Sequence, residues 1–353
     1  MYLLEIKDLK VYFYTLKGIV RAVDGVTLNI DRGEIVGVVG ESGSGKSVTA
    51  MSIMRLIPEP PGKIAGGGLY FEGRDVIKLK EGEMQKIRGK KISMIFQEPM
   101  TALNPVFTVG EQIGEMLRLH LNMTRKDATD KSVELLNLVG ISAPERRIKE
   151  YPHQLSGGMR QRIMIAMAVS CNPSLVIADE PTTALDVTIQ AQIMDLILRL
   201  KEEFGMAIMF ITHNFGVVTE ICKRVVVMYA GKIVEESDIM TIFEEPRHPY
   251  TEGLLKAIPC MDDTGVKDSK SSLLPPLSKG GRRDFKTKRL YEIKGRVPDL
   301  YNIPEGCRFN PRCPYVMDIC KREEPPLLDV GGGHHSACWL VTNNSEQITL
   351  KSR

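Results

Sequence analysis

Short apolar runs alternate with longer amphipathic segments along residues 1–240. Residues 34–39 form a continuous apolar run that ends in glycine, which is typical of a buried parallel strand. The pattern predicts strands over residues 5–14, 26–30, 34–39, 92–97, 175–179, 207–212, 224–229 and 231–234, and helices over 46–57, 108–121, 125–139, 156–169 and 189–204. Strands that alternate with helices of this length predict an α/β fold with a mostly parallel sheet covered by helices.

No apolar run approaches the ~18–20 residues that a membrane span needs. The longest runs, at residues 35–39, 206–211 and 225–229, have the length of strands. The first residues lack a basic segment followed by an apolar one, so no secretory signal is expected. We therefore expect a chain that does not itself cross a bilayer and that works in a reducing compartment.

The composition changes near residue 260. The 353 residues as a whole, with 43% hydrophobic and 26% charged residues and a net charge of +3, match soluble globular proteins and exclude disordered or fibrous classes. Residues 261–296, however, hold ten Lys and Arg against five Asp and Glu, which gives this stretch a charge of +5. We predict a large domain over residues 1–259, a basic linker over 260–290 and a small Pro- and Cys-rich part over 291–353.

One segment fits the phosphate-binding pattern G-x-x-x-x-G-K-[ST] and lies between an apolar strand and a helix: Gly40-Glu41-Ser42-Gly43-Ser44-Gly45-Lys46-Ser47. Glycines allow the backbone to fold around a polyphosphate, and the amide groups at the helix N-terminus favour its charge. Lys46 is expected to reach the β- and γ-phosphates, and the Ser47 hydroxyl to ligate Mg²⁺. The candidate ATP-binding residues here are Ser42, Gly43, Ser44, Gly45, Lys46, Ser47 and Val48.

A second apolar strand, over residues 175–179, ends in the two acids Asp179 and Glu180. A phosphate-binding loop of this type works with a carboxylate on a neighbouring strand that holds the metal ion. We expect Asp179 to face Mg²⁺ and Glu180 to polarise the water that attacks the γ-phosphate.

A third motif, Leu155-Ser156-Gly157-Gly158-Met159-Arg160-Gln161-Arg162, lies just upstream of these acids. It resembles the signature motif of ATP-binding cassette (ABC) ATPases, which usually has Gln where this chain has Met159. Ser156 and the amides of Gly157 and Gly158 stand at a predicted helix start, where an anion is favoured. The resemblance implies that the signature of one subunit faces the phosphate-binding loop of another, so that two ATP molecules are sandwiched in a head-to-tail dimer.

Further family landmarks follow in the expected order over residues 1–250. Gln97 resembles the glutamine that ligates Mg²⁺ and senses the membrane partner, Asp186 resembles the aspartate of the D-loop, and His213 resembles the switch histidine that contacts the γ-phosphate. The resemblance thus implies that Lys46, Glu180 and His213 are catalytic. It also implies a helical subdomain over about residues 98–170 that contacts the partner.

The adenine platform is a less specific signal. Tyr12, Phe13 and Tyr14 all offer rings in an early strand, and the spacing to Ala22 favours Phe13. The alternative is that these rings belong to the core.

Four of the seven cysteines crowd into the C-terminal part, with the spacing Cys307-x5-Cys313-x6-Cys320-x17-Cys338. Structural zinc sites usually use tighter C-x2–4-C pairs, so the spacing leaves an iron–sulfur cluster, zinc or cysteines without a metal. His334 and His335 are competing ligands.

The C-terminal part also resembles the extension of the oligopeptide/dipeptide importer subfamily, through His248-Pro249-Tyr250 and the segment 295–298. Members of that subfamily carry a four-iron four-sulfur cluster on four such cysteines. The resemblance implies a [4Fe–4S] cluster here, with Zn²⁺ as the alternative.

The resemblance implies an ATPase subunit that powers import of di- or oligopeptides from the cytoplasmic face of the membrane. Its partners would be a second ABC ATPase subunit, two transmembrane permeases and, indirectly, an extracytoplasmic peptide-binding protein. The same role for nickel or another solute is an alternative. A soluble ABC ATPase of DNA repair or translation is a further one, although this chain lacks the long coiled-coil insertion or second cassette typical of that class. No nucleic-acid partner is expected.

Overall fold

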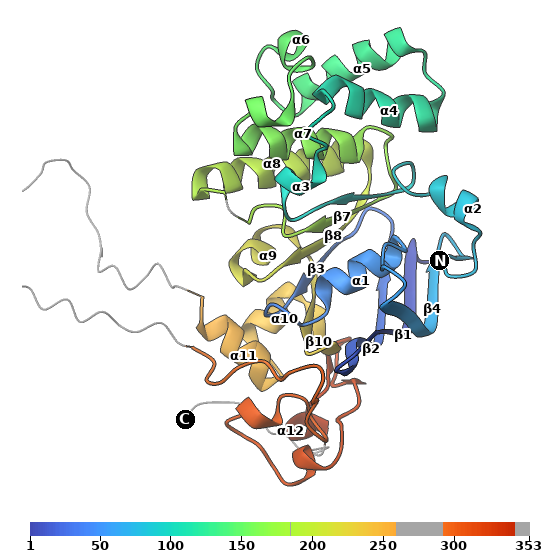
Figure 1. The fold of residues 1–353 in the computed structure, drawn as a ribbon. Helices are drawn as coiled ribbons and strands as arrows, with labels where there is room; N and C mark the ends of the chain where they lie inside the picture. Colours follow the sequence, from blue (N-terminus) through green and yellow to red (C-terminus); the bar gives the residue numbers. More distant parts are fainter. Residues whose placement is uncertain (184, 259–291, 343–353) are drawn as a thin grey trace, which may run out of the picture.

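A computed structural model describes residues 1–183, 185–258 and 292–342 (Figure 1). The predicted basic linker over 260–290 lies outside these residues. Two β-sheets and the helices around them make up the described part, and the helices α4, α5 and α6 gather at one end while the C-terminal residues lie at the opposite end (Figure 1).

The larger sheet has eight strands, and its central part is parallel. In spatial order the strands are β11 (Leu328–Asp329), β12 (His335–Ser336), β10 (Lys232–Asp238), β9 (Arg224–Tyr229), β3 (Ile35–Val39), β8 (Ala207–Thr212), β7 (Leu175–Asp179) and β6 (Ile92–Ile95). Pairing is parallel from β9 to β6 and antiparallel from β11 to β9. The predicted parallel sheet is thus confirmed, and β3, β7 and β8 place their carboxyl ends side by side.

The smaller sheet is antiparallel, in the order β2 (Gly18–Ile30), β1 (Leu4–Thr15), β4 (Gly62–Phe71) and β5 (Arg74–Asp75). The predicted strand over 26–30 is too short, and β4 was not predicted because its glycines obscure the apolar alternation. At position 67 the structure requires glycine, because φ is +89° and a Cβ would lie 2.3 Å from the Asp8 carbonyl oxygen.

Each of the five predicted helices is present, and all but the first agree with the prediction to within a few residues; the remaining helices were not predicted. The bounds of the helices are α1 (Lys46–Ile53), α2 (Glu81–Gln85), α3 (Pro99–Ala102), α4 (Val109–Leu121), α5 (Arg125–Leu138), α6 (Pro144–Arg147), α7 (Gly157–Val169), α8 (Val187–Phe204), α9 (Phe215–Ile221), α10 (Ile239–Glu244), α11 (Pro249–Lys256) and α12 (Trp339–Thr342). α1 ends four residues before the predicted position because Arg55 takes a left-handed conformation with φ 49°. None of the described helices is long and apolar enough to span a membrane.

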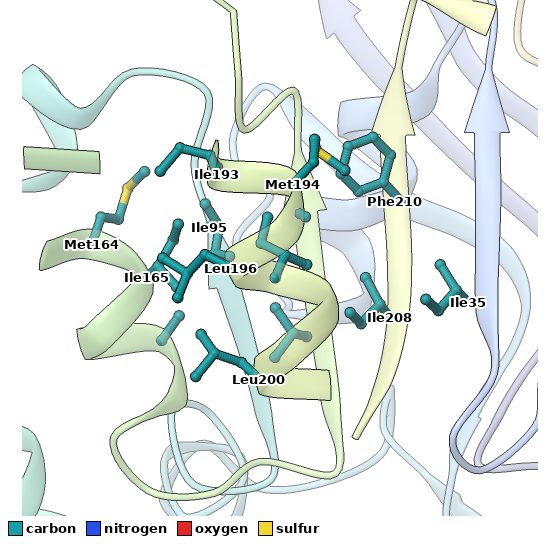
Figure 2. Packing of buried hydrophobic residues seen from close by; sticks show 14 of the residues in the cluster. Ile35, Ile95, Met164, Ile165, Ile193, Met194, Leu196, Leu200, Ile208 and Phe210 are labelled. Atoms are coloured by element: carbon teal, nitrogen blue, oxygen red, sulfur yellow. The ribbon is translucent and has the colours of Figure 1, made fainter. Parts of the chain in front are cut away.

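α8 packs between the large sheet and α7 through its apolar face. Ile193, Leu196 and Leu200 project from this helix toward α7 and the strands, and Ile208 and Phe210 meet them from β8 (Figure 2). All five side chains are at most 2% exposed. This core fixes β7 and β8 and so determines where the residues after each strand are placed.

The C-terminal residues pack directly against the cassette. β12 pairs with β10, where Glu235 lies opposite Ser336, and β11 continues the same sheet. Arg308 is buried against Asp24 of β2 and donates a hydrogen bond to the Ala230 carbonyl at 2.6 Å. This region is therefore joined to both sheets.

Candidate active site

The phosphate-binding loop connects β3 to α1 and requires glycine at two tight places. Gly40 has φ +154°, and a Cβ there would lie 2.2 Å from the Met228 carbonyl oxygen. Gly45 has φ +102°, and a Cβ would lie 2.5 Å from the Ala22 carbonyl oxygen. Side chains at these positions would push the loop away from β9 and β2, so the glycines set the position of the backbone amides.

Lys46 is the first residue of α1 and lies buried beneath this loop. Its Nζ donates hydrogen bonds to the carbonyl oxygens of Gly40, at 2.7 Å, and Glu41, at 3.0 Å. Burial lowers the pKa of Lys46, against the opposing charges of Glu180 and Asp179. A polyphosphate at the loop would act in the same direction as these carboxylates and favour the ammonium form.

Ser47 and Asp179 meet at the carboxyl end of β7. The Ser47 hydroxyl donates to Oδ1 of Asp179 at 3.1 Å. Burial raises the pKa of Asp179, and the hydrogen bond from Ser47 partly offsets this. The two side chains provide adjacent oxygen ligands of the kind that Mg²⁺ prefers.

Three neighbours hold the carboxylate of Glu180. Gln97 Nε2 donates to Oε2 at 2.9 Å, the Thr183 hydroxyl donates to the same oxygen at 3.0 Å, and His213 Nδ1 lies 3.2 Å from Oε1. Glu180 itself has a left-handed backbone with φ 47°, which directs the chain away from β7 immediately after the strand. The sequence predicted Gln97, Glu180 and His213, but Thr183 was missed.

Except for Asp179, these groups surround one cavity of about 840 Å³, within the usual size range of ligand sites. It is lined by Ala22, Glu41, Ser42, Gly43, Ser44, Gly45, Lys46, Ser47, Val48, Gln97, Glu180, Thr183, His213, Leu254, Val297 and Leu300. The seven predicted loop residues all lie in this lining, together with Gln97, Glu180 and His213.

Three apolar residues of the lining were not predicted to belong to this site. Leu254 comes from α11, and Val297 and Leu300 come from the segment that precedes the cysteines. Phe13, predicted to support the adenine, is not among the described residues of the lining. It lies opposite Gly62 on β4 and packs against the hydrophobic core between the smaller sheet and α1. Its adenine contact stays a prediction.

The signature residues lie apart from this cavity. Ser156 caps α7, with its hydroxyl accepting a hydrogen bond from the Met159 amide at 3.3 Å, and Ser156 and Gly157 are exposed. Asp186 caps α8 by accepting from the Ile189 amide at 2.9 Å. An exposed helix N-terminus that is flanked by small residues can bind an anion from outside the chain.

The four clustered cysteines, Cys307, Cys313, Cys320 and Cys338, line a second, small cavity. The Cys307 amide donates to the Cys320 carbonyl at 2.8 Å, which closes the loop that carries three of them. Burial raises the pKa of Cys307 to about 11 and that of Cys338 to about 12. Thiols with such pKa values stay protonated at neutral pH unless a positive group favours their thiolates.

The two histidines considered as competing ligands are engaged elsewhere. His334 Nε2 lies 2.7 Å from Oε1 of the buried Glu235, and His335 Nδ1 lies 3.1 Å from the Gly333 carbonyl oxygen. Over residues 1–183, 185–258 and 292–342, no three His, Cys, Asp or Glu side chains are placed to hold one metal ion.

Two family models match the chain. The model described as ABC transporter matches residues 23–183, and the model of the C-terminal region of oligopeptide/dipeptide transporters matches residues 234–276 and 282–320. The second match covers most of β10, all of α11 and the first three clustered cysteines.

Among curated proteins, the oligopeptide transport ATP-binding protein AppD of Bacillus subtilis is 51% identical over 338 residues, 96% of each chain. The dipeptide transport ATP-binding protein DppD of Haemophilus influenzae is 47% identical over 331 residues, 94% of this chain and 93% of that protein. Among solved structures, a dimeric post-hydrolysis state of the ATP-binding cassette MJ0796 with ADP and Pi is 31% identical, has a TM-score of 0.60, and covers 67% of this chain and 98% of its own. The predicted fold class is confirmed, and the chain belongs to the ABC transporter ATP-binding subunits of the oligopeptide/dipeptide importer family.

Proposed function

We propose that this chain hydrolyses ATP to drive the import of di- or oligopeptides through a membrane transporter. The names of its relatives support the cargo, and the arrangement around Glu180 carries the catalytic part of the proposal. Glu180 accepts a proton from the attacking water, while Gln97, Thr183 and His213 hold its carboxylate in place. Lys46 balances the charge of the β- and γ-phosphates.

Mg²⁺ is the ion that ABC ATPases use with ATP, and the residues present fit it. Ser47, Asp179 and Gln97 would hold the ion, and Mg²⁺ when bound neutralises charge on the phosphate oxygens. The role of this chain's own residues is to fix the triphosphate and to orient water.

The exposed signature residues support a head-to-tail dimer. Ser156, Gly157 and Gly158 stand outside the cavity of their own chain, so they are available to the ATP of a second ABC ATPase subunit. Two permeases and an extracytoplasmic peptide-binding protein complete the proposed importer, which places this chain at the cytoplasmic face of the membrane as a peripheral subunit.

Replacing Glu180 by glutamine tests the catalytic assignment. The variant keeps the hydrogen-bonding shape but loses the base, so we expect Mg²⁺-dependent ATP hydrolysis to fall roughly 100-fold or more while ATP binding persists. Glu202→Gln, at a side chain that is 78% exposed on α8, is the matched control and should hydrolyse ATP normally. Normal turnover in Glu180→Gln would refute the assignment.

The cargo is tested in the source cell. Deletion of the gene should abolish uptake of labelled di- or oligopeptides, and the wild-type gene, but not the Glu180→Gln version, should restore it. Peptide uptake that survives deletion while nickel uptake is lost would favour the alternative cargo.

We further propose a [4Fe–4S] cluster on Cys307, Cys313, Cys320 and Cys338. All four side chains line one small cavity, and their spacing is wider than the C-x2–4-C pairs of structural zinc sites, which favours the cluster over Zn²⁺. Anaerobically purified protein should contain about four irons and four sulfides per chain and show a visible absorption band that dithionite bleaches. A colourless protein with one zinc per chain would refute the cluster.

A further inference from the structure

Glu41, the second residue of the phosphate-binding loop, is contacted from two sides by residues more than 200 positions away in the sequence. The guanidinium of Arg312 donates to both carboxylate oxygens, from Nη1 to Oε2 at 2.6 Å and from Nη2 to Oε1 at 3.0 Å. The phenol oxygen of Tyr250 accepts the Glu41 backbone N–H at 2.8 Å. Side chain and backbone of one loop residue are therefore both fixed by the C-terminal region.

Arg312 is held rigidly in this position. Its side chain is 4% exposed, and it donates further hydrogen bonds to the carbonyl oxygens of Lys294, at 3.1 Å, and Ile293, at 3.3 Å. The guanidinium also lies over the rings of Tyr229 and Phe309, 5.8 and 5.9 Å from their centroids. A buried, bidentate and stacked arginine is a specific arrangement rather than a chance surface pair.

Tyr250 is the last residue of the His248-Pro249-Tyr250 sequence and is fully buried. Its ring packs 4.6 Å from the ring of Tyr229 and 5.5 Å from that of Phe309, measured between centroids. His248 caps the N-terminus of α11: its Nδ1 accepts a hydrogen bond from the Tyr250 amide at 3.1 Å. The motif thus orients a phenol toward the loop.

The charge of Glu41 makes these contacts consequential. A carboxylate on the loop that receives a triphosphate repels the phosphates and attracts the Lys46 ammonium, which already contacts the Glu41 carbonyl. Arg312 supplies the compensating positive charge without entering the cavity lining.

We propose that Arg312 and Tyr250 are positioning residues of the ATP site. Arg312 cancels the charge of Glu41, and Arg312 and Tyr250 together fix the position of the loop that binds the triphosphate. The inference rests on the proposed ATP-binding role of the loop. The Lys46→Ala variant distinguishes failure of the proposed function from failure of this inference. If Lys46→Ala binds ATP normally, the proposed function is wrong. If only the Arg312 variant binds ATP normally, this inference alone is wrong.

The test is ATP titration calorimetry on the full chain without Mg²⁺, so that no hydrolysis occurs. Arg312→Ala should bind ATP roughly tenfold more weakly, because an uncompensated carboxylate faces the phosphates. Adding Glu41→Gln should restore the affinity to within about threefold of wild type, since it removes the charge that Arg312 compensates. Arg322→Ala, at an exposed arginine of the same region, is the matched control and should bind normally.

Rescue separates a charge effect from loss of structure, because Glu41→Gln cannot refill the space that Arg312 leaves. Failure of the double variant to recover would overturn the proposal, as would wild-type affinity in Arg312→Ala. With Mg²⁺ present, KM for ATP should rise while kcat stays within about twofold.

Two further measurements keep the idea testable if Arg312→Ala does not fold. Arg312→Lys retains the charge but loses the bidentate geometry, and Tyr250→Phe leaves the Glu41 amide without its acceptor; each should weaken ATP binding roughly fivefold. Inorganic tripolyphosphate should show the same losses as ATP. Losses confined to ATP would overturn the proposal, because the contacts act on the phosphate side.

Discussion

Replacing Arg308 by methionine should release the C-terminal region from the cassette. Its side chain is 6% exposed and that of its partner Asp24 is 12% exposed, so the pair is screened from water. Arg308 also donates to the Ala230 carbonyl, and the Tyr12 hydroxyl donates to Asp24 at 2.6 Å. Methionine replaces the apolar stem but removes the cation that is hydrogen-bonded to Asp24, so that, among the described residues, only the charge of Lys232 still acts on this buried carboxylate.

The magnitude follows from this burial. Removing one partner of a buried ion pair costs about 3–5 kcal/mol, because the remaining charge stays desolvated. The cost falls on the docked state of residues 292–342, so the equilibrium constant for local opening should rise by roughly two to four orders of magnitude.

Hydrogen exchange measured by mass spectrometry at pH 7 reports this opening. Peptides that cover Arg308 and Cys320 should lose protection by that factor, whereas peptides of α8 should not change. Lys321→Met, at a side chain that is 61% exposed, is the control and should exchange like wild type. Adding Asp24→Asn should recover part of the loss, since it removes the orphaned charge. Unchanged exchange in Arg308→Met, or no recovery in the double variant, would refute the reasoning.

The pH dependence has a definite sign. Burial acts to raise the pKa of Asp24, but the hydrogen bond from Tyr12 and the charge of Arg308 outweigh it, and the net pKa lies below the ordinary 3.8. A lowered pKa stabilises the folded state above pH 3.8, and this stabilisation is lost as the pH falls through the folded pKa. Arg308→Met raises the pKa of Asp24, so the difference in stability between the variant and the wild type should become smaller as the pH falls.

Two other predictions concern the loop that carries the cysteines and the contact with the adenine of ATP. Gly306→Ala should lower stability by ~2 kcal/mol or more in thermal unfolding, because φ is +70° and the new Cβ would lie 2.3 Å from the Cys320 carbonyl oxygen; Gly332→Ala, with φ +66° and open space, is the control, and an equal loss there would refute the steric cause. Leu300→Ala should raise KM for ATP more than Phe13→Ala does, because Leu300 lines the cavity and Phe13 is not among the described residues that line it. If ATPase assays show the larger rise in KM for Phe13→Ala, adenine contacts Phe13 instead.

Local chemistry explains what the sequence could predict of the fold and the site. Strands 35–39, 175–179 and 207–212 are continuous apolar runs, and the glycines and Lys46 stand at fixed offsets from the first. Because parallel strands end at one edge, the residues that follow them, Glu180 and His213, had to meet Lys46. Periodicity and motif spacing were therefore sufficient for this part.

Long-range partners were beyond such reasoning. Nothing in the pattern around Arg312 or Val297 points to a loop near residue 41, since buried ion pairs and apolar linings depend on how distant segments pack. β4 was missed for a different reason: glycines at 66–68 have no side chains to show the alternation that marks a strand. Histidine is a common metal ligand, so His334 was a candidate from the sequence, but its Nε2 contacts the Glu235 carboxylate.

The place of β12 in the large sheet has a consequence for biosynthesis. β10 leaves the ribosome with one edge unpaired, and the strand that covers this edge, His335–Ser336, is made about 100 residues later. At typical translation rates the interval is roughly 5–20 s, during which the amides and carbonyls of β10 are open to another nascent chain. β12 thus covers the edge of β10, and a chain that stops short of it would expose that edge to other strands rather than merely lack a C-terminal segment.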